Sequence, residues 1–320
     1  MNPDTLKPYP DGGNALSVSI VIPARNEAAS LRTLLPRLRE VVATGEIIVV
    51  DDGSTDDTAT VCEALDARVV SHPYGMGNGA AIKSGARVAI GDILVFMDAD
   101  GQHDPADIPR LLEKLDRGYD MVVGARQKGS QATVGRGLAN RFYNRLASLM
   151  TGQPIADLTS GFRAVRAEKF RQFLYLLPNG FSYPTTSTMA FFRSGYPVAY
   201  VPIVASERIG SSHIKPLKDG LRFLLIIFRI GTLYSPLKLF APVAAVHGLF
   251  GVGYYVYTFA TQGRLSLATL FLLTASVTIF LIGLVSEQIT QLMYRTTSET
   301  SYRNGNFNVE RPTVDRISKQ

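Results

Sequence analysis

The sequence lacks the cysteines needed for disulfide bonds and the apolar N-terminal segment of a secreted protein. Its 320 residues contain one cysteine, Cys62, and no tryptophan. Cys62 therefore has no partner for an intrachain disulfide or a cysteine-based metal site, and we expect it in the core. The first seventeen residues lack the apolar segment of a signal peptide, which predicts that the globular part of the chain stays cytoplasmic. We interpret residues 1–16 as a flexible leader.

The sequence also lacks long runs of like charge. The formal net charge is only +6, and the Lys and Arg residues do not form a long basic run. Nucleic-acid-binding domains gather their positive charge on one face or helix. The charge pattern favours a membrane surface or an anionic phosphate as partner, and no nucleic acid.

Residues 17 to about 124 alternate short β-branched runs with helical segments. This alternation predicts an α/β domain with a mainly parallel sheet. Ligands of such sheets bind beyond the carboxyl ends of the strands. The predicted strands are 18–22, 46–50, 68–70, 93–97 and 121–123, and the predicted helices are 28–42, 56–66, 79–89 and 105–117.

The strand 93–97 is followed by two carboxylates, Asp98 and Asp100. Alternation along an extended strand would place both on one side. Carboxylates at a strand end suit Mg²⁺ or Mn²⁺, with substrate phosphates completing the coordination. An isolated Asp-x-Asp is most often a polar turn. The polar clusters 23–27 and 51–57 are predicted at the same edge, and they favour a metal–diphosphate site.

Two long apolar runs follow residue 236. Leu239–Ala260 has His247 as its only ionisable residue, and Leu265–Val285 has no charge, so each is long enough to cross a bilayer. We predict two transmembrane helices; the alternative is a buried globular hairpin. Lys and Arg gather outside the short connection, and the positive-inside rule therefore places both chain ends in the cytoplasm.

The segment before the first span is amphipathic. Within Pro216–Tyr234, Lys218, Arg222 and Arg229 share one face of a helix, while apolar residues occupy another. This pattern predicts a helix lying in the headgroup layer, although a core helix is the alternative. The predicted units are a leader 1–16, an α/β domain 17–214, an interfacial helix 215–235, a transmembrane hairpin 236–293 and a polar tail 294–320.

Four motifs occur in order within residues 17–213. They are V-I-P-A-R-N-E at 21–27, V-V-D-D-G-S-T-D at 49–56, M-D-A-D-G-Q at 97–102 and D-L-T-S-G-F-R at 157–163. Together they resemble the family 2 glycosyltransferases of GT-A fold, a Rossmann-like α/β fold. Within that family the likeness is to the polyprenyl-phosphate (dolichol-phosphate mannose synthase-like) enzymes, whose membrane-anchored bacterial members carry a C-terminal pair of spans.

The resemblance implies a nucleotide-sugar site at the strand ends. Asp51 and Asp52 are candidate acceptors for the base and ribose, although an Asp-Gly-Ser turn that caps a helix is the alternative. The Gly75–Gly79 segment lacks the dinucleotide-binding spacing and is assigned to loop geometry near the nucleotide. The implied nucleotide-sugar residues are Pro23, Ala24, Arg25, Asn26, Glu27, Asp51, Asp52, Asp98, Ala99, Asp100 and Arg208.

The resemblance also implies a cation bound by Asp98, Asp100 and Gln102, with Mg²⁺ or Mn²⁺ as cofactor. Arg208 lies in a segment where relatives carry a mobile R-x-x-G-x-S-K loop. His213 stands where that loop carries Lys, which leaves the role of residue 213 open.

Arginines supply the implied acceptor site. Arg126 matches the family's acceptor-phosphate arginine, and Arg136 with Asn140 falls where a second phosphate contact is expected. Asp157 should face the sugar or orient an acceptor-side arginine. Arg163 either contacts the acceptor phosphate or forms a structural ion pair with Asp157. The implied catalytic residues are Asp100, Asp157, Arg126 and Arg136.

These features predict a metal-dependent inverting glycosyltransferase. It would move one sugar from a UDP- or GDP-sugar to undecaprenyl or dolichyl phosphate at the inner membrane, with two spans and both termini cytoplasmic. A processive polysaccharide synthase is the enzymatic alternative, but such synthases carry a Gln-x-x-Arg-Trp motif and more spans. A non-catalytic nucleotide-sugar-binding membrane subunit is the other alternative. Homo-oligomers are expected to be feasible.

Overall fold

The computed structural model describes residues 16–127, 134–180, 183–205, 228, 231, 232 and 234–304. Within these ranges the side chains of 134–140, 142 and 293–304 are not described. Arg208 and His213 lie outside the described residues. Most of the predicted interfacial helix lies outside them too.

A seven-stranded sheet forms the centre of the α/β domain, in the order β3-β2-β1-β4-β6-β5-β7. Among the strands of the described residues, only β6 runs antiparallel to its neighbours, β4 and β5. The prediction of a mainly parallel sheet is therefore confirmed. The strands are β1 (Val18–Ala24), β2 (Glu46–Asp51), β3 (Arg68–Ser71), β4 (Ile93–Phe96), β5 (Met121–Arg126), β6 (Arg163–Arg166) and β7 (Val198–Ile203).

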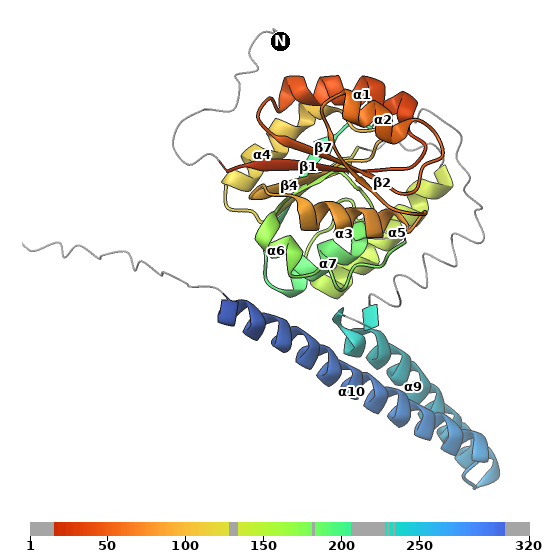
Figure 1. The fold of residues 1–320 in the computed structure, drawn as a ribbon. Coiled ribbons are helices and arrows are strands. Elements are labelled where there is room, and N and C mark those ends of the chain that lie inside the picture. Colours follow the sequence, from red (N-terminus) through yellow and green to blue (C-terminus); the bar gives the residue numbers. More distant parts are fainter. Residues whose placement is uncertain are drawn as a thin grey trace, which may run out of the picture.

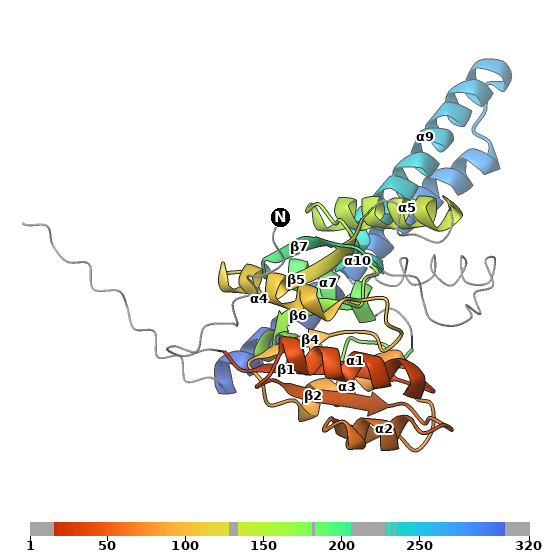
Figure 2. The ribbon, with the colours of Figure 1, turned by 90° about the horizontal axis from the view of Figure 1, so that it is seen from above.

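Helices cover both faces of this sheet (Figures 1 and 2). Side chains alternate between the faces along each strand, so neighbouring residues enter different cores. Ile20 and Ile22 pack with the α1, α2 and α4 side, whereas Val21 packs with α3, α5, α6 and α7. The helices are α1 (Ala28–Val41), α2 (Thr58–Ala64), α3 (Asn78–Val88), η1 (Pro105–Asp107), α4 (Ile108–Asp116), α5 (Val134–Thr151), α6 (Ala167–Arg171) and α7 (Tyr183–Arg193).

Local signals in the sequence explain several boundaries. Asp104 caps the turn at Pro105 by accepting a hydrogen bond from the backbone N–H of Ala106. The helix predicted at 56–66 begins only at Thr58, because the Asp56 side chain accepts from the Thr58 backbone N–H. Cys62 is fully buried on α2, as predicted.

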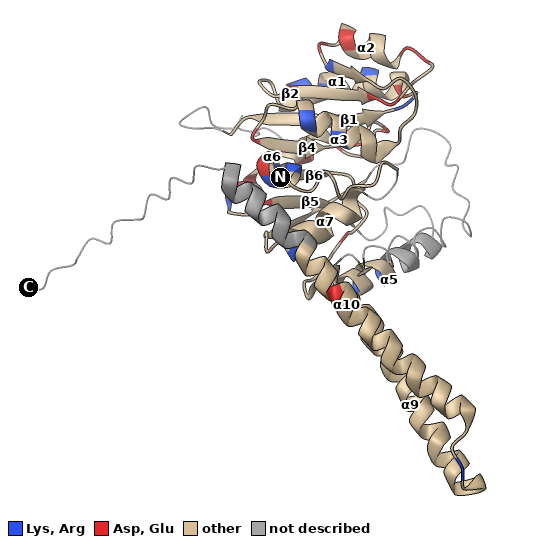
Figure 3. Cartoon of the chain, turned by 60° about the horizontal axis from the view of Figure 1, so that its bottom comes forward, with Lys and Arg blue, Asp and Glu red and all other residues tan. Residues whose placement is uncertain are grey.

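The last part of the chain is a helical hairpin of α9 (Pro236–Gln262) and α10 (Leu267–Asn304). Pro236–Gln262 and Leu267–Leu292 are long and apolar enough to cross a membrane, and only 11% of each apolar window is buried. Figure 3 shows that the charged residues lie mainly on the α/β domain and that the described part of the hairpin carries few of them. The helical backbone continues through Asn304, so the predicted polar tail from residue 294 begins as part of α10.

Candidate active site

The carboxyl ends of β1 and β2 bring the first two motifs together. Ala24 pairs with Asp51 in the parallel register, and the Asp52 backbone N–H donates to Ala24 O at 2.8 Å. Asn26 has a positive φ of 55°, a conformation that Asn tolerates better than most residues. Its Oδ1 accepts from the Thr55 backbone N–H at 2.8 Å. The 23–27 and 51–56 segments therefore form one hydrogen-bonded unit at the sheet edge.

Asp51 and Asp52 have different surroundings in this unit. Both oxygens of Asp52 accept hydrogen bonds, from His72 Nδ1 and from the backbone N–H groups of Met76 and Gly77. Burial alone would raise the pKa of Asp52, but these hydrogen bonds outweigh it and lower the pKa. Asp52 thus holds the 72–77 loop, and its direct contact with a nucleotide stays a prediction.

Asp51 retains capacity to accept from a ligand. Among the described residues, the one hydrogen bond to its carboxylate comes from the Ser54 backbone N–H to Oδ1, at 2.9 Å. The exposed Arg25 lies across Gly75, where an added Cβ would approach Arg25 Nη1 within 2.5 Å. These two side chains remain candidates for contact with a nucleotide.

The glycine-rich segment packs against a distant part of the chain. The backbone N–H of Gly79 donates to Gly180 O at 3.2 Å, and that of Ala80 donates to Asn179 O at 2.9 Å. A Cβ on Gly79 would lie 2.0 Å from Pro178 O, so the close contact requires glycine there. The start of α3 is therefore occupied by the 178–180 segment, which leaves these two N–H groups unavailable to a phosphate.

Asp98 and Asp100 follow β4 but do not continue its extended backbone. The strand ends at Phe96, and residues 99–101 form a turn in which Gly101 has a φ of +73°. The strand-alternation argument is therefore wrong, although both carboxylates lie at the predicted edge. Asp100 Oδ1 accepts from the Gln102 backbone N–H at 3.2 Å, which stabilises the turn.

The 161 backbone closes against the Asp98 carboxylate. A Cβ on Gly161 would lie 2.7 Å from Asp98 Oδ2, so a side chain there would displace the carboxylate. The described residues contain no group of three His, Cys, Asp or Glu side chains able to hold a metal by themselves. Two carboxylates and an amide are nevertheless a suitable partial donor set for Mg²⁺ or Mn²⁺ when a diphosphate supplies further oxygens. The residues at 98–102 fit that cation.

Arg126 and Asp157 form the best-defined charged contact at the sheet edge. Arg126 Nε donates to Asp157 Oδ2 at 2.8 Å, and Nη2 donates to Oδ1 at 3.0 Å. Nη2 also donates to Thr159 Oγ1 at 2.6 Å. This bidentate geometry fixes the plane of the guanidinium. Burial would raise the pKa of Asp157, but the Arg126 hydrogen bonds lower it, so the carboxylate is ionised at neutral pH.

Arg163 is placed differently from the prediction. Its side chain is fully buried, and its guanidinium donates to Pro184 O at 2.9 Å and to Ser187 Oγ at 2.8 Å. It also donates to Thr188 Oγ1 and to Ser160 O. An acceptor phosphate cannot reach this interior position, and Asp157 is paired with Arg126 instead. Both predicted roles of Arg163 are therefore wrong.

Three neighbours of these motifs were not identified from sequence. Thr159 contacts Arg126, and the fully buried Tyr183 donates from its hydroxyl to Gly161 O at 2.9 Å. His103 is stacked on Phe162 with 5.0 Å between ring centroids, and burial lowers its pKa to about 4. Thr159 lies within the fourth motif, but a lone Tyr or His gives no sequence signal. The side chains of Arg136 and Asn140 fall outside the described set.

Family models match two segments of the chain. Residues 19–174 match glycosyl transferase family 2, and residues 235–292 match the GtrB C-terminal hairpin. The chain is also similar to a solved glucosyl-3-phosphoglycerate synthase from Mycobacterium tuberculosis in complex with Mn²⁺, UDP and phosphoglyceric acid. The TM-score is 0.53 at 25% identity, covering 68% of this chain and 78% of that chain.

Two curated relatives are named for the reaction that they catalyse. An undecaprenyl-phosphate mannosyltransferase from Micrococcus luteus is 33% identical over 60% of this chain and 85% of its own length. An undecaprenyl-phosphate 4-deoxy-4-formamido-L-arabinose transferase from Klebsiella pneumoniae is 38% identical over 47% of this chain, and the match spans about half of that relative's length, 48%. With the two family models and the GT-A architecture, these matches show that the chain belongs to the family 2 glycosyltransferases, among the polyprenyl-phosphate glycosyltransferases.

Proposed function

We propose that the protein is an inverting glycosyltransferase that moves a single sugar from a UDP- or GDP-sugar to polyprenyl phosphate at the cytoplasmic membrane face. The observation that carries this proposal is the Arg126–Asp157 pair, which lies at the same sheet edge as Asp98. Asp98 contributes electrostatically to the raised pKa of Arg126, so the carboxylate and the guanidinium are close enough to interact. Donor and acceptor groups would meet at this edge.

The acceptor chemistry fits arginines better than a general base. A polyprenyl phosphate oxygen is already anionic at neutral pH, so in-line attack on the anomeric carbon needs positioning and charge compensation. Asp157 occupies Nε and Nη2 of Arg126, while Nη1 has no hydrogen bond among the described residues. We assign Nη1 to the acceptor phosphate and Asp157 to orienting it.

On the donor side, Asp51 and Arg25 would bind the nucleotide, and Asp98, Asp100 and Gln102 would hold the cation. A bound Mg²⁺ or Mn²⁺ would lower the negative charge that develops on the departing nucleoside diphosphate. The structural relative was crystallised with Mn²⁺ and UDP, and another complex of it with Mg²⁺ and UDP. Those relatives support the choice of metal and of a nucleotide ligand.

The apolar helices α9 and α10 support placement at the membrane. A long-chain polyprenyl phosphate cannot leave the bilayer, so the enzyme has to be held at its surface. We propose that the hairpin crosses the membrane twice, with residue 262 on the far side and the catalytic domain in the cytoplasm. Tags at residues 1, 262 and 320 test this directly. Cytoplasmic labelling at residue 262 would refute the two-span topology without affecting the assignment of the reaction.

A processive synthase is the weaker candidate. The sequence contains no tryptophan, so it lacks the Gln-x-x-Arg-Trp motif, and the described residues contain two apolar helices of membrane-spanning length. A non-catalytic binding subunit is weaker as well, because the carboxylates at 98 and 100 and the ordered Arg126 have no evident purpose in it.

A transfer assay tests the function and names the donor. Membranes that contain the protein are incubated with undecaprenyl phosphate and a panel of radiolabelled UDP- and GDP-sugars, and the lipid is then extracted. We expect one labelled sugar per lipid from one donor class. Label in a polymer would indicate a processive synthase, and no labelled lipid from any donor, despite nucleotide-sugar binding, would indicate a non-catalytic subunit.

A further inference from the structure

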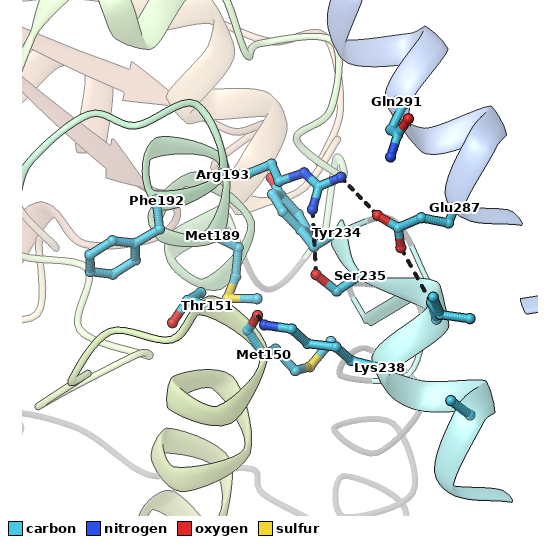
Figure 4. A pocket seen from close by; sticks show the side chains of 12 residues that line it. Met150, Thr151, Met189, Phe192, Arg193, Tyr234, Ser235, Lys238, Glu287 and Gln291 are labelled. Atoms are coloured by element: carbon cyan, nitrogen blue, oxygen red, sulfur yellow. Dashed lines mark hydrogen bonds and ion pairs between the residues drawn. The ribbon is translucent and has the colours of Figure 1, made fainter. Parts of the chain in front are cut away.

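A second polar site lies where the catalytic domain meets the hairpin. It is a cavity of about 610 Å³ between the C-terminal ends of α5 and α7, the first turns of α9 and the part of α10 around Glu287 (Figure 4). Arg193, Lys238, Glu287 and Gln291 line it, together with apolar side chains. None of these residues belongs to the nucleotide-sugar or acceptor site described above.

The acidic residue of this cavity is already compensated. Glu287 Oε1 lies 3.2 Å from Arg193 Nη2, and Oε2 accepts from the Leu237 backbone N–H at 3.4 Å. Arg193 also donates to Ser235 Oγ at 3.5 Å, so it connects α7 to the start of the hairpin. This pair contributes no net charge to the cavity.

Lys238 leaves the cavity positively charged. Its Nζ donates to Met150 O at 2.9 Å, and no carboxylate of the described residues lies within ion-pair distance of it. An ammonium has three donors, so capacity remains for a ligand. Lys238 also lies in the first turn of α9, where the helix dipole disfavours a cation. An anion in the cavity would compensate both the unpaired charge of Lys238 and its unfavourable interaction with the helix dipole.

The remaining lining and its depth indicate what kind of anion fits. Met150, Met189, Leu237 and Ala241 supply an apolar wall beside Lys238. Lys238 lies at the first turn of α9 and Glu287 near the end of the apolar part of α10. With the hairpin across a bilayer, this end lies at the headgroup layer, where a charged group and an alkyl chain are adjacent.

We propose that this junction cavity binds an anionic phospholipid of the bilayer, with Lys238 contacting the headgroup phosphate and the apolar wall contacting an acyl chain. The proposal rests on the membrane placement of the hairpin but not on sugar transfer. The polyprenyl acceptor is the less suitable occupant. Helix α7 separates Tyr183, beside Gly161, from Arg193 by ten residues, or about 15 Å along its axis. An acceptor phosphate at Arg126 is therefore not the phosphate at Lys238.

Native mass spectrometry of the full-length protein in detergent tests the proposal. The protein is titrated with short-chain phosphatidylglycerol, with short-chain phosphatidylcholine and with inorganic phosphate. We expect one phosphatidylglycerol to bind about fivefold more tightly than phosphatidylcholine, because both lipids carry a phosphate but only phosphatidylglycerol has a net negative charge to compensate Lys238. Inorganic phosphate should not displace it. Equal binding of the two lipids, or displacement by inorganic phosphate alone, would overturn the proposal.

Matched variants locate the effect. Lys238→Gln should remove the preference for phosphatidylglycerol, Lys238→Arg should retain it, and Arg145→Gln should change nothing, because Arg145 is exposed on α5 away from the lining. Circular dichroism checks that each variant is folded. If Lys238→Gln does not fold, Ala241→Phe provides the decision, since it fills the apolar wall and keeps the charge. Unchanged phosphatidylglycerol binding by Ala241→Phe would then contradict the proposal.

Discussion

Arg126 and Arg163 lie on adjacent strands, but their side chains have contrasting environments. Arg126 is at the carboxyl end of β5, its side chain is 26% exposed, and a carboxylate holds it in two places. Arg163 begins β6, pairs with Val123 of β5, and is completely buried among carbonyl and hydroxyl oxygens. Burial lowers the pKa of Arg163, whereas hydrogen bonds from Arg126 to Asp157 outweigh burial and raise that of Arg126.

The difference shows how a motif arginine acquires its task. A guanidinium that a carboxylate orients at an accessible edge keeps a donor for a ligand. A guanidinium that is surrounded by neutral acceptors uses its N–H groups to join segments of the fold. Arg163 joins residue 160 to helix α7 in this way. Removing the interior arginine should therefore affect folding, and removing the edge arginine should affect chemistry.

The largest effect is expected at the interior position. Arg163→Met removes the buried guanidinium that donates to Ser160 O, Pro184 O and the hydroxyls of Ser187 and Thr188. A hydrogen bond from a charged group contributes about 1.5–3 kcal/mol, and the hydrogen bonds that Pro184 O and the two hydroxyls keep within α7 should limit the total loss to about 3–5 kcal/mol. Thermal melting followed by circular dichroism measures it. Arg145→Met is the exposed control, and equal melting of the two variants would show that Arg163 is not structural.

Asp100→Asn should act on chemistry alone. We expect transfer to fall at least about a hundredfold, the scale of losing a key electrostatic contact, with melting unchanged. The radiolabelled-lipid assay gives the rate, and a titration with Mg²⁺ or Mn²⁺ should show activity that depends on the cation in the wild type. Full turnover of the wild type in excess chelator would remove the metal from the proposal.

Arg126→Ala sharpens the comparison at the edge. It should slow use of the lipid acceptor by about 10- to 100-fold and leave nucleotide-sugar affinity nearly intact, because the donor site lies on β1, β2 and β4. Arg126→Lys should recover only part of the rate, since lysine lacks the planar fork that Asp157 holds. Acceptor and donor affinities are measured separately. If nucleotide-sugar affinity falls and lipid-acceptor affinity stays normal, Arg126 belongs to the nucleotide-sugar side of the site and the assignment to the acceptor phosphate is wrong.

The smallest effect is expected from Asp52→Asn. This variant tests whether the Asp52 carboxylate at the sheet edge stabilises the fold. Its lowered pKa means that the ionised form stabilises the fold, fully above the ordinary value of 3.8 and progressively less as the pH falls below it. The variant should lose about 1–2 kcal/mol at pH 7 and match the wild type more closely near pH 3. Melting across that range tests the sign; a constant difference would exclude the ionised carboxylate as the cause.

Sequence patterns located the first half of the fold well because it consists of regular β–α units. The apolar runs at 46–50 and 93–97 are β2 and β4 to within one residue. Strand β6 was missed because its four residues, Arg163 to Arg166, begin and end in arginine and overlap the last motif. Burial of an arginine depends on helix α7 from a later part of the chain, and no local pattern carries that information.

The candidate site was predictable at the level of motifs but not of contacts. The three polar clusters do meet at one edge, because parallel strands end there together. Asp52 accepts hydrogen bonds from His72 and from the 76–77 backbone, and Asp51 does not. The motif does not include these partners, so it does not tell the two carboxylates apart. The pairing of Asp157 with Arg126, and not with Arg163, likewise depends on strand order: β5 and β6 are neighbours only because β6 inserts antiparallel beside β4.

The contact between the start of α3 and residues 177–180 has a consequence for the order of folding during synthesis. Lys83 bonds to Leu177 O and to the side chain of Asn179, the latter 96 residues further along the chain. At translation rates of about 5–20 residues per second, helix α3 waits about 5–20 s for those partners to leave the ribosome. The apolar face of α3 can already pack on β1 and β2, which precede it in the chain, but its first turn completes its hydrogen bonds only when residues 177–180 have been made.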